Sequence, residues 1–146
     1  MQRLQGKIAV VTGAGNGIGR ATAMLLAAEG AHVWVTDVDG AAAQSVAAAI
    51  CGEGRVASAM AVDVSRGQDT SALFRDIGVA HGRIDVLVNN AGMNVRADFR
   101  HLSDADWVRI REVNLDGVLR IARDGFELLR ASGNGALVNI ASIMGH

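Results

Sequence analysis

The sequence has 146 residues, of which 50% are hydrophobic and 20% charged, and its formal net charge is −1. This apolar fraction excludes a disordered chain, and the near-neutral charge argues against nucleic acid as the main partner, because phosphate binding leaves a basic footprint. No apolar run approaches the about 18 residues that a membrane span needs. A single cysteine excludes an intrachain disulfide and a cysteine-based zinc site.

The beginning of the sequence and its cysteine content bear on where the protein works. The first seven residues run straight into a strand-like stretch and leave no room for a signal peptide. One cysteine, Cys51, is consistent with a reducing compartment. We therefore expect a cytoplasmic protein. A metal site is not expected, because His32, His81 and His101 share no ligand spacing.

Short apolar runs alternate with longer stretches of helical periodicity along the chain. The runs predict strands at residues 7–12, 31–36, 55–62, 84–88 and 135–141. The stretches between them predict helices, one capped by Asp39 and one opened by Ser65 and Gln68 in a capping-box pattern. Buried strands alternating with helices predict parallel strands joined by right-handed crossovers. The expected fold is a doubly wound parallel α/β sheet.

Ser103 predicts the start of the longest helix. Apolar residues along this helix recur at steps of three, four or seven, as in an amphipathic helix. They form one apolar stripe: Val108, Leu115, Leu119, Ala122, Phe126 and Leu129.

The sequence TGAGNGIG, residues 12–19, lies between the first predicted strand and the first predicted helix. A dinucleotide pyrophosphate needs close approach of the backbone, free N–H groups and a positive helix end. Glycines allow the first, and the start of a helix supplies the other two. We expect this turn to bind the cofactor through Gly13, Gly15, Asn16, Gly17, Ile18 and Gly19. The alternative is a glycine-rich structural turn.

Asp37 ends the second predicted strand, where it could accept hydrogen bonds from both ribose hydroxyls of an adenosine. Its carboxylate would repel a 2′-phosphate, and an NADP site normally offers Arg or Lys instead. Neither Val38 nor Asn16 is basic. These residues favour NAD as the cofactor, the alternative being that Asp37 is only a solvated cap.

These residues resemble the short-chain dehydrogenase/reductase family, whose glycine turn has the TGxxxGxG spacing found here. The resemblance continues in the family's order over essentially the whole chain. It is carried by Asp63-Val64, Asn89-Asn90-Ala91-Gly92, Val113-Asn114-Leu115 and Asn139-Ile140-Ala141-Ser142. It implies a Rossmann fold and an enzyme that transfers hydride between NAD and a secondary alcohol or ketone. It also implies a dimer or tetramer formed partly through the long helix.

The resemblance also implies roles for the residues of these motifs. The cofactor-binding set then includes Asp63 beside Val64 at the adenine amine, and Asn90, Ala91 and Gly92 at the adenosine ribose. In the catalytic set, Asn114 would hold a water of a proton relay, and Ser142 would bond the substrate oxygen. Asn89 is expected to brace neighbouring strands. Substrate-pocket lining is expected from Met93, Asn94, Ile143 and Met144.

The chain departs from the family at its catalytic Tyr and Lys, which lie in a YxxxK motif beyond the serine. It contains no tyrosine, its only lysine is Lys7, and it ends at His146. We therefore expect residues 1–146 to be the truncated NAD-binding domain of a longer dehydrogenase, inactive alone, without the C-terminal strands and helices. Residues 135–141 would then form a bare sheet edge. The alternatives are a non-catalytic nucleotide-binding module or pseudoenzyme and, less compatible with the glycine spacing, an epimerase.

Overall fold

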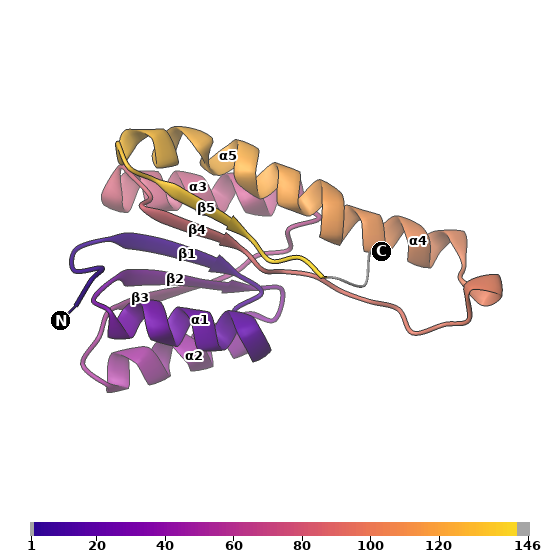
Figure 1. Ribbon diagram of the computed structural model, residues 1–146, viewed down its shortest axis with the longest axis horizontal. Helices are drawn as coiled ribbons and strands as arrows, with labels where there is room; N and C mark the ends of the chain where they lie inside the picture. Colours follow the sequence, from indigo (N-terminus) through magenta and orange to yellow (C-terminus); the bar gives the residue numbers. More distant parts are fainter. Residues whose placement is uncertain (1, 143–146) are drawn as a thin grey trace.

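The computed structural model describes residues 2–142. Its five strands form one parallel sheet in the order β3-β2-β1-β4-β5 (Figure 1). The strands are β1 (Ile8–Thr12), β2 (His32–Asp37), β3 (Ala57–Ala61), β4 (Val86–Asn89) and β5 (Ala136–Asn139). This arrangement confirms the doubly wound parallel sheet. The first, third and fifth expected strands are one to three residues longer than the observed ones, because their outer residues lie in the adjoining turns, and the second and fourth are shifted by one or two residues toward the N-terminus.

The helices form two layers, one on each face of the sheet (Figure 1). One face carries α1 (Gly17–Ala28) and α2 (Gly40–Gly52), and the other carries α3 (Gly67–His81) and α5 (Val118–Ala131). Three further helical segments complete the described chain: the 3-10 helix η1 (Phe99–His101), α4 (Asp104–Arg111) and the π-helix η2 (Glu112–Gly117).

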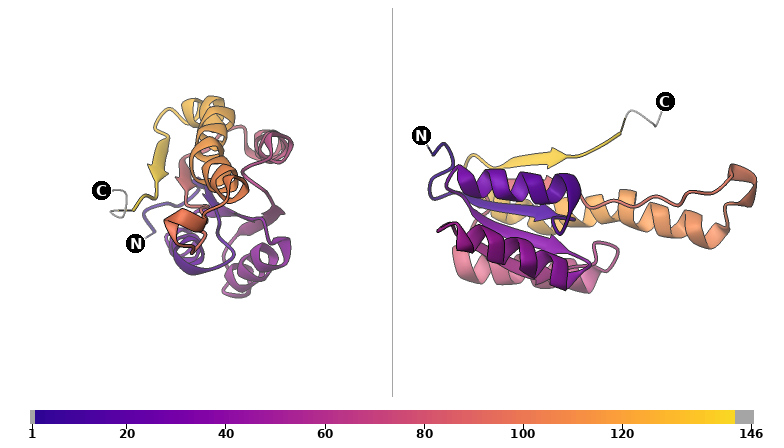
Figure 2. Two further views of the ribbon diagram at one scale, coloured as in Figure 1. Left: turned by 90° about the vertical axis from the view of Figure 1, so that its right-hand side faces the viewer. Right: turned by 90° about the horizontal axis from the view of Figure 1, so that it is seen from below.

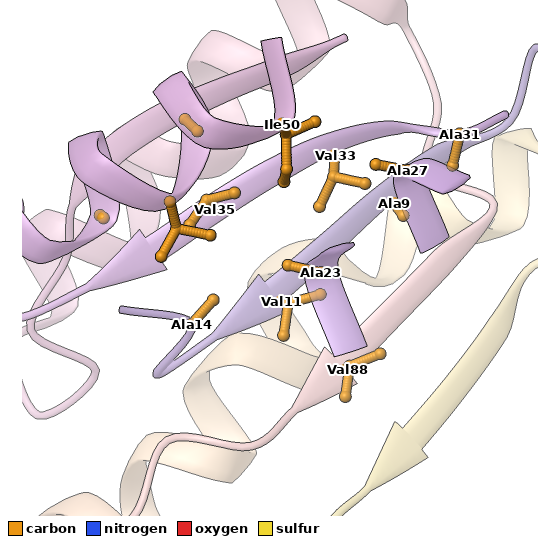
Figure 3. Close-up of a cluster of buried hydrophobic side chains, with 13 residues drawn as sticks. Ala9, Val11, Ala14, Ala23, Ala27, Ala31, Val33, Val35, Ile50 and Val88 are labelled. Carbon is orange, nitrogen blue, oxygen red and sulfur yellow. The ribbon is translucent and has the colours of Figure 1, made fainter. Parts of the chain in front are cut away.

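Side chains of β1 alternate between two hydrophobic cores. Ala9 and Val11 face α1 and α2, where they pack with Ile50 (Figure 3). Ile8 and Val10 face the other layer, and the core there also contains residues of α3, β4 and α5: Leu73, Phe74, Ile77, Leu87 and Ile121. A strand that is buried on both faces must be apolar throughout, which explains why the predicted strands are continuous apolar runs.

The helix starts confirm two expected caps and correct a third. Asp39 accepts hydrogen bonds from the backbone N–H groups of Ala41 and Ala42, and Ser103 caps α4. The capping box at Ser65 is absent from the start of α3, whose N-cap is Arg66. The Ser65 hydroxyl and backbone N–H donate instead to the Asp63 side chain. Ser65 therefore belongs to a turn that lies before the start of α3 at Gly67.

The long helix is a continuous rod, because α4, η2 and α5 follow one another without a gap between residues 104 and 131. Figure 2 shows its first part projecting beyond the sheet. The apolar stripe that the sequence predicts lies mostly on the outside, with Leu115, Leu119 and Phe126 more than half exposed. Ile121 and Gly125 face the core instead. A Cβ on Gly125 would lie 2.8 Å from the Phe74 ring, so the missing side chain lets α5 approach the core closely.

At the edge of the described sheet lies β5, which pairs with β4 (Figure 2). All four of its residues are exposed, although Leu137 and Val138 are apolar. In the described part of the chain, β5 therefore forms the unpaired sheet edge that the sequence predicts. Within residues 2–142, no helix is both long enough and apolar enough to cross a bilayer.

A buried carboxylate ties the amino-terminal ends of three strands together. Asp85, immediately before β4, is 3% exposed. It accepts hydrogen bonds from the Ile8 N–H at 2.9 Å, the Lys7 ammonium at 3.0 Å and the Ser132 hydroxyl at 2.8 Å. Arg83 adds a longer ion pair at 3.3 Å. Because these groups lie at or before the starts of β1, β4 and β5, Asp85 links the three strand starts.

Candidate functional site

A cavity of about 640 Å³ opens beyond the carboxyl ends of the first four strands. Gly13 follows β1, Asp37 ends β2, Val62 follows β3 and Asn90 follows β4, and all four line the cavity. In the sheet, β2 and β3 lie on one side of β1, and β4 and β5 lie on its other side, so the strand order reverses direction at β1. Ligands of open α/β sheets bind at such a switch point. The volume lies within the range of small-molecule and cofactor sites.

The glycine turn forms one wall of this cavity, and its glycines serve two different purposes. Gly17 lines the cavity, has φ +52°, and a Cβ there would meet no atom within 4 Å. Gly19 faces the turn itself: a Cβ would overlap the Gly13 carbonyl oxygen. Gly17 therefore keeps open space for a ligand, whereas Gly19 allows the turn to close.

The first turn of α1 points toward the same space. Asn16 is the N-cap, and within the described residues its side chain makes no capping hydrogen bond. The orphan N–H groups at the helix start therefore lack a side-chain acceptor. Asn16 and Ile18 both line the cavity, and Ile18 is 65% exposed. This helix end has the free donors and positive dipole end that suit an anion.

Hydrogen bonds from the end of β4 hold the glycine turn in place. The Asn90 side-chain amide donates to the carbonyl oxygens of Thr12 and Gly13, both at 3.0 Å. The backbone N–H groups of Asn90 and Ala91 donate to the Thr12 hydroxyl at 3.1 and 3.0 Å. Asn90 thus lines the cavity and also supports the adjacent glycine turn.

The Asp37 carboxylate is 8% exposed and lies at the cavity wall. One oxygen accepts the Gly15 N–H at 2.8 Å, and the other accepts the Asp39 N–H at 3.0 Å. A carboxylate has about four acceptor positions, so each oxygen can still accept a ligand hydroxyl. These backbone bonds fix the side chain in one orientation before any ligand arrives.

The Asp63 side chain is held in a similar way. Its Oδ1 accepts from the Ser65 N–H at 2.9 Å and the Ser65 hydroxyl at 2.6 Å. Its backbone N–H donates to Asp69 at 3.0 Å. Within the described chain, Oδ2 of Asp63 makes no hydrogen bond. Because Asp63 and Val64 line the cavity, this oxygen is an acceptor that a bound amine could use.

Comparison with known proteins identifies the family that carries this site. The family model described as short chain dehydrogenase matches residues 7–146. The chain belongs to the short-chain dehydrogenase family. Cis-4-hydroxycyclohexanecarboxylate dehydrogenase from Sinomonas cyclohexanicum is 40% identical to it over 140 residues, which are 95% of this chain and 56% of that protein. Meso-2,3-butanediol dehydrogenase from Serratia marcescens is 40% identical over 144 residues, with 98% and 56% covered.

Solved structures agree with this assignment. A short-chain dehydrogenase/reductase from Burkholderia xenovorans superimposes with a TM-score of 0.93 at 35% identity, covering 99% of this chain and 60% of that one. A metagenomic short-chain oxidoreductase in complex with NADP has a TM-score of 0.91 at 35% identity, with 97% and 64% covered. The chain therefore spans somewhat more than half the length of these dehydrogenases.

Asn114 lies in the π-helix η2, next to Val113, which lines the cavity. Its side-chain oxygen accepts the Met93 N–H at 2.8 Å, and its amide donates to the Met93 carbonyl oxygen at 2.8 Å. Asn114 thereby fixes the backbone that follows Gly92. π-Helical turns in α-helices are frequent at functional sites.

Most predicted cofactor residues line the cavity, but four of the predicted site residues do not. Gly15 and Gly19 lie behind its wall, and neither Asn114 nor Ser142 belongs to the described lining. Ser142 is the last described residue, and it follows β5. Of the residues expected to line a substrate pocket, Met93 lines this cavity and Asn94 does not, whereas Ile143 and Met144 lie outside the described residues. Asn89 braces strands as expected: its amide donates to Asn139 at 3.0 Å.

The family motifs do not include every residue of the site. Arg109 and Glu112 of the long helix line the cavity, as do Val62 and Ser65. The helix residues lie far along the sequence from the glycine turn, and only helix packing brings them to it. Their one sequence signal is proximity to Asn114. Ser65 could have been found from its position two residues after Asp63, a spacing typical of an Asx turn.

Proposed function

We propose that residues 1–146 form the NAD-binding domain of a cytoplasmic short-chain dehydrogenase that transfers hydride between NAD and a secondary alcohol or ketone. The observation that carries the proposal is that the open space at Gly17, the start of α1 and the Asp37 carboxylate all face one cavity. The dehydrogenase names of the relatives support the reaction class.

The residues of the cavity fit the parts of NAD in order. The α1 N-terminus and the backbone at Gly17 would bind the phosphates, Asp37 would bind the adenosine ribose, and Asp63 would accept the adenine amine. The bound cofactor would supply the hydride acceptor. Asn114 would act by holding the Met93 backbone and a water, and Ser142 would orient the substrate oxygen.

Asp37 supports NAD over NADP. A 2′-phosphate would lie next to a carboxylate that two backbone N–H groups hold in place. Two charges about 4 Å apart repel by roughly 1 to 4 kcal/mol, depending on solvent exposure. The NADP in the metagenomic relative belongs to that protein and leaves this argument unchanged.

Calorimetric titration of the chain with NAD and NADP tests the cofactor assignment. We expect NAD to bind at least about tenfold more tightly than NADP. The repulsion between Asp37 and the 2′-phosphate is expected to exceed about 1.4 kcal/mol, which corresponds to a tenfold difference in affinity. The Asp37→Asn variant should reduce this preference to about threefold or less. Asp39→Asn removes the same charge from a residue outside the described lining and should leave the preference unchanged. Equal affinity of the unmodified chain for both cofactors would contradict the assignment.

The absence of tyrosine favours one alternative, a nucleotide-binding module without catalysis. Loss of a general acid/base costs about 10²- to 10⁴-fold in rate. We propose that the 146-residue chain binds NAD but does not detectably oxidise alcohols. NADH formation with a panel of secondary alcohols measures this, and turnover by the chain alone would contradict it.

The outer stripe of the long helix supports a homo-oligomer, and we expect Leu119→Lys to weaken it. Leu119 and Phe126 are 65% and 57% exposed. Burying one leucine contributes about 1.5–3 kcal/mol, and a two-fold interface contains two copies of it. The dissociation constant of the Leu119→Lys variant should therefore rise by about 100-fold or more. Light scattering over a concentration series measures the assembly. Val79→Lys, at an exposed apolar position on α3, is the control. Assembly that survives Leu119→Lys would assign the contact to another surface, such as β5.

A further inference from the structure

The cavity is lined by three carboxylates but by only one cation among the described residues. The carboxylates belong to Asp37, Asp63 and Glu112, and the cation is Arg109. A site of this composition is poorly suited to attract an anionic dinucleotide by charge alone. Arg109 is therefore the one side chain of the described lining with a positive charge that could contact a bound dinucleotide.

Arg109 lines the same cavity as Asp63 and Val64, and it does so from the long helix. Residues 109, 112 and 113 are spaced i, i+3 and i+4, so their side chains share one helix face, and all three line the cavity. The same helix packs tightly against Val64: a Cβ on Gly117 would lie 2.8 Å from the Val64 side chain. The helix that carries Arg109 therefore borders the cavity beside the segment that carries Asp63 and Val64.

The Arg109 side chain is not committed to another partner in residues 2–142, where it forms no hydrogen bond or ion pair. Neighbouring arginines of the same region are paired: Arg111 with Asp116 at 3.5 Å, and Arg100 with Asp98 at 2.9 Å. Arg109 is also exposed, so its guanidinium can reorient without breaking contacts. An unpaired arginine at a cavity wall is suited to contact a ligand.

We propose that the Arg109 guanidinium stacks on the face of the adenine ring in the cofactor cavity. This inference rests on the proposed binding of NAD. Val64 and Val113 line the same cavity and are available to contact the purine. A planar guanidinium stacks on aromatic rings through cation–π and dispersion attraction, whereas the compact ammonium of lysine lacks the plane. Arg109 is thus a specificity residue for a purine base.

Calorimetric titration of NAD into Arg109→Ala, Arg109→Lys and Arg111→Ala variants tests the proposal, with ADP as a competitor that carries only the adenosine half. Both Arg109 variants should bind NAD and ADP about three- to tenfold more weakly, because stacking needs the guanidinium plane. Arg111→Ala is the matched control, since it removes the same group from a position outside the described lining. It should bind like the unmodified chain.

Each contrary outcome has a distinct meaning. Full affinity in Arg109→Lys would show that only the charge matters and would overturn stacking. Unchanged ADP competition in Arg109→Ala would place the contact away from adenine and would overturn it too. Equal weakening in Arg111→Ala would indicate a general charge effect, with the same consequence. If the unmodified chain binds no NAD, the proposed function fails together with this inference, whereas binding that Arg109→Ala leaves intact overturns the inference alone.

Discussion

Replacing Asp85 with Asn is expected to lower the free energy of unfolding by about 2–3 kcal/mol at neutral pH. The carboxylate is buried and accepts from Ile8, Lys7 and Ser132. An amide has one acceptor oxygen in place of two, and its NH₂ group would face donors. The loss should therefore exceed that of an ordinary hydrogen bond. Urea unfolding followed by circular dichroism measures it.

The same carboxylate should make stability depend on pH in the acid range. Burial raises the pKa of Asp85, but the hydrogen bonds from Ile8, Ser132 and Lys7 outweigh burial and lower the pKa from 3.8 to about 2. A carboxyl group with a lowered folded-state pKa contributes its full stability above 3.8 and loses it as the pH falls toward 2. The Asp85→Asn variant should lack this part of the acid transition.

Asp76→Asn provides the control, because Asp76 is half exposed and pairs with Arg75 on the surface of α3. Surface ion pairs contribute about 0–1 kcal/mol, so this variant should remain close to the unmodified chain. If Asp85→Asn were as stable as the control at neutral pH, Asp85 would not be the residue that holds the three strand ends together.

Alanine substitutions at Gly17 and Gly19 are expected to separate ligand binding from folding. Gly19→Ala places a Cβ 2.8 Å from the Gly13 carbonyl carbon, and backbone cannot yield cheaply, so it should cost about 3 kcal/mol or more. Gly17→Ala meets no atom within 4 Å and costs only the strain of φ +52°, roughly 1 kcal/mol. Its methyl group would instead fill the space proposed for a phosphate.

Thermal unfolding and NAD titration together check this pair. Gly17→Ala should fold and lose about tenfold or more in NAD affinity, the value of one charge-assisted hydrogen bond. Gly19→Ala should unfold at a lower temperature than Gly17→Ala and the unmodified chain. Undiminished NAD affinity in Gly17→Ala would mean that the phosphates lie elsewhere, and normal stability in Gly19→Ala would contradict the close packing of the turn.

The sequence was most informative where function and local structure depend on the same residues. The glycine turn, Asp37 and the residues after β4 are all short segments next to a strand end, and parallel strands bring their carboxyl ends to one edge. Knowing five alternating strands and helices was therefore enough to place these segments around one cavity. The bracing role of Asn89 followed for the same reason.

The long helix shows where this reasoning stops. Its larger apolar residues, such as Leu119 and Phe126, suggest the buried face, yet they lie outside. Ile121 and Gly125 face the core because a glycine lets the helix pack tightly on Phe74. Periodicity predicts that two faces differ, but only packing against a particular neighbour decides which face is buried.

The sequence by itself determined the alternation of strands and helices, the glycine turn and the carboxylate at the second strand, because each depends on residues within a few positions of one another. Only the tertiary structure decided that Arg109 and Val113 complete the cavity and that Asp85 joins three strand ends. Those contacts join segments far apart in the chain, and their geometry follows from how helices and strands pack rather than from any local pattern.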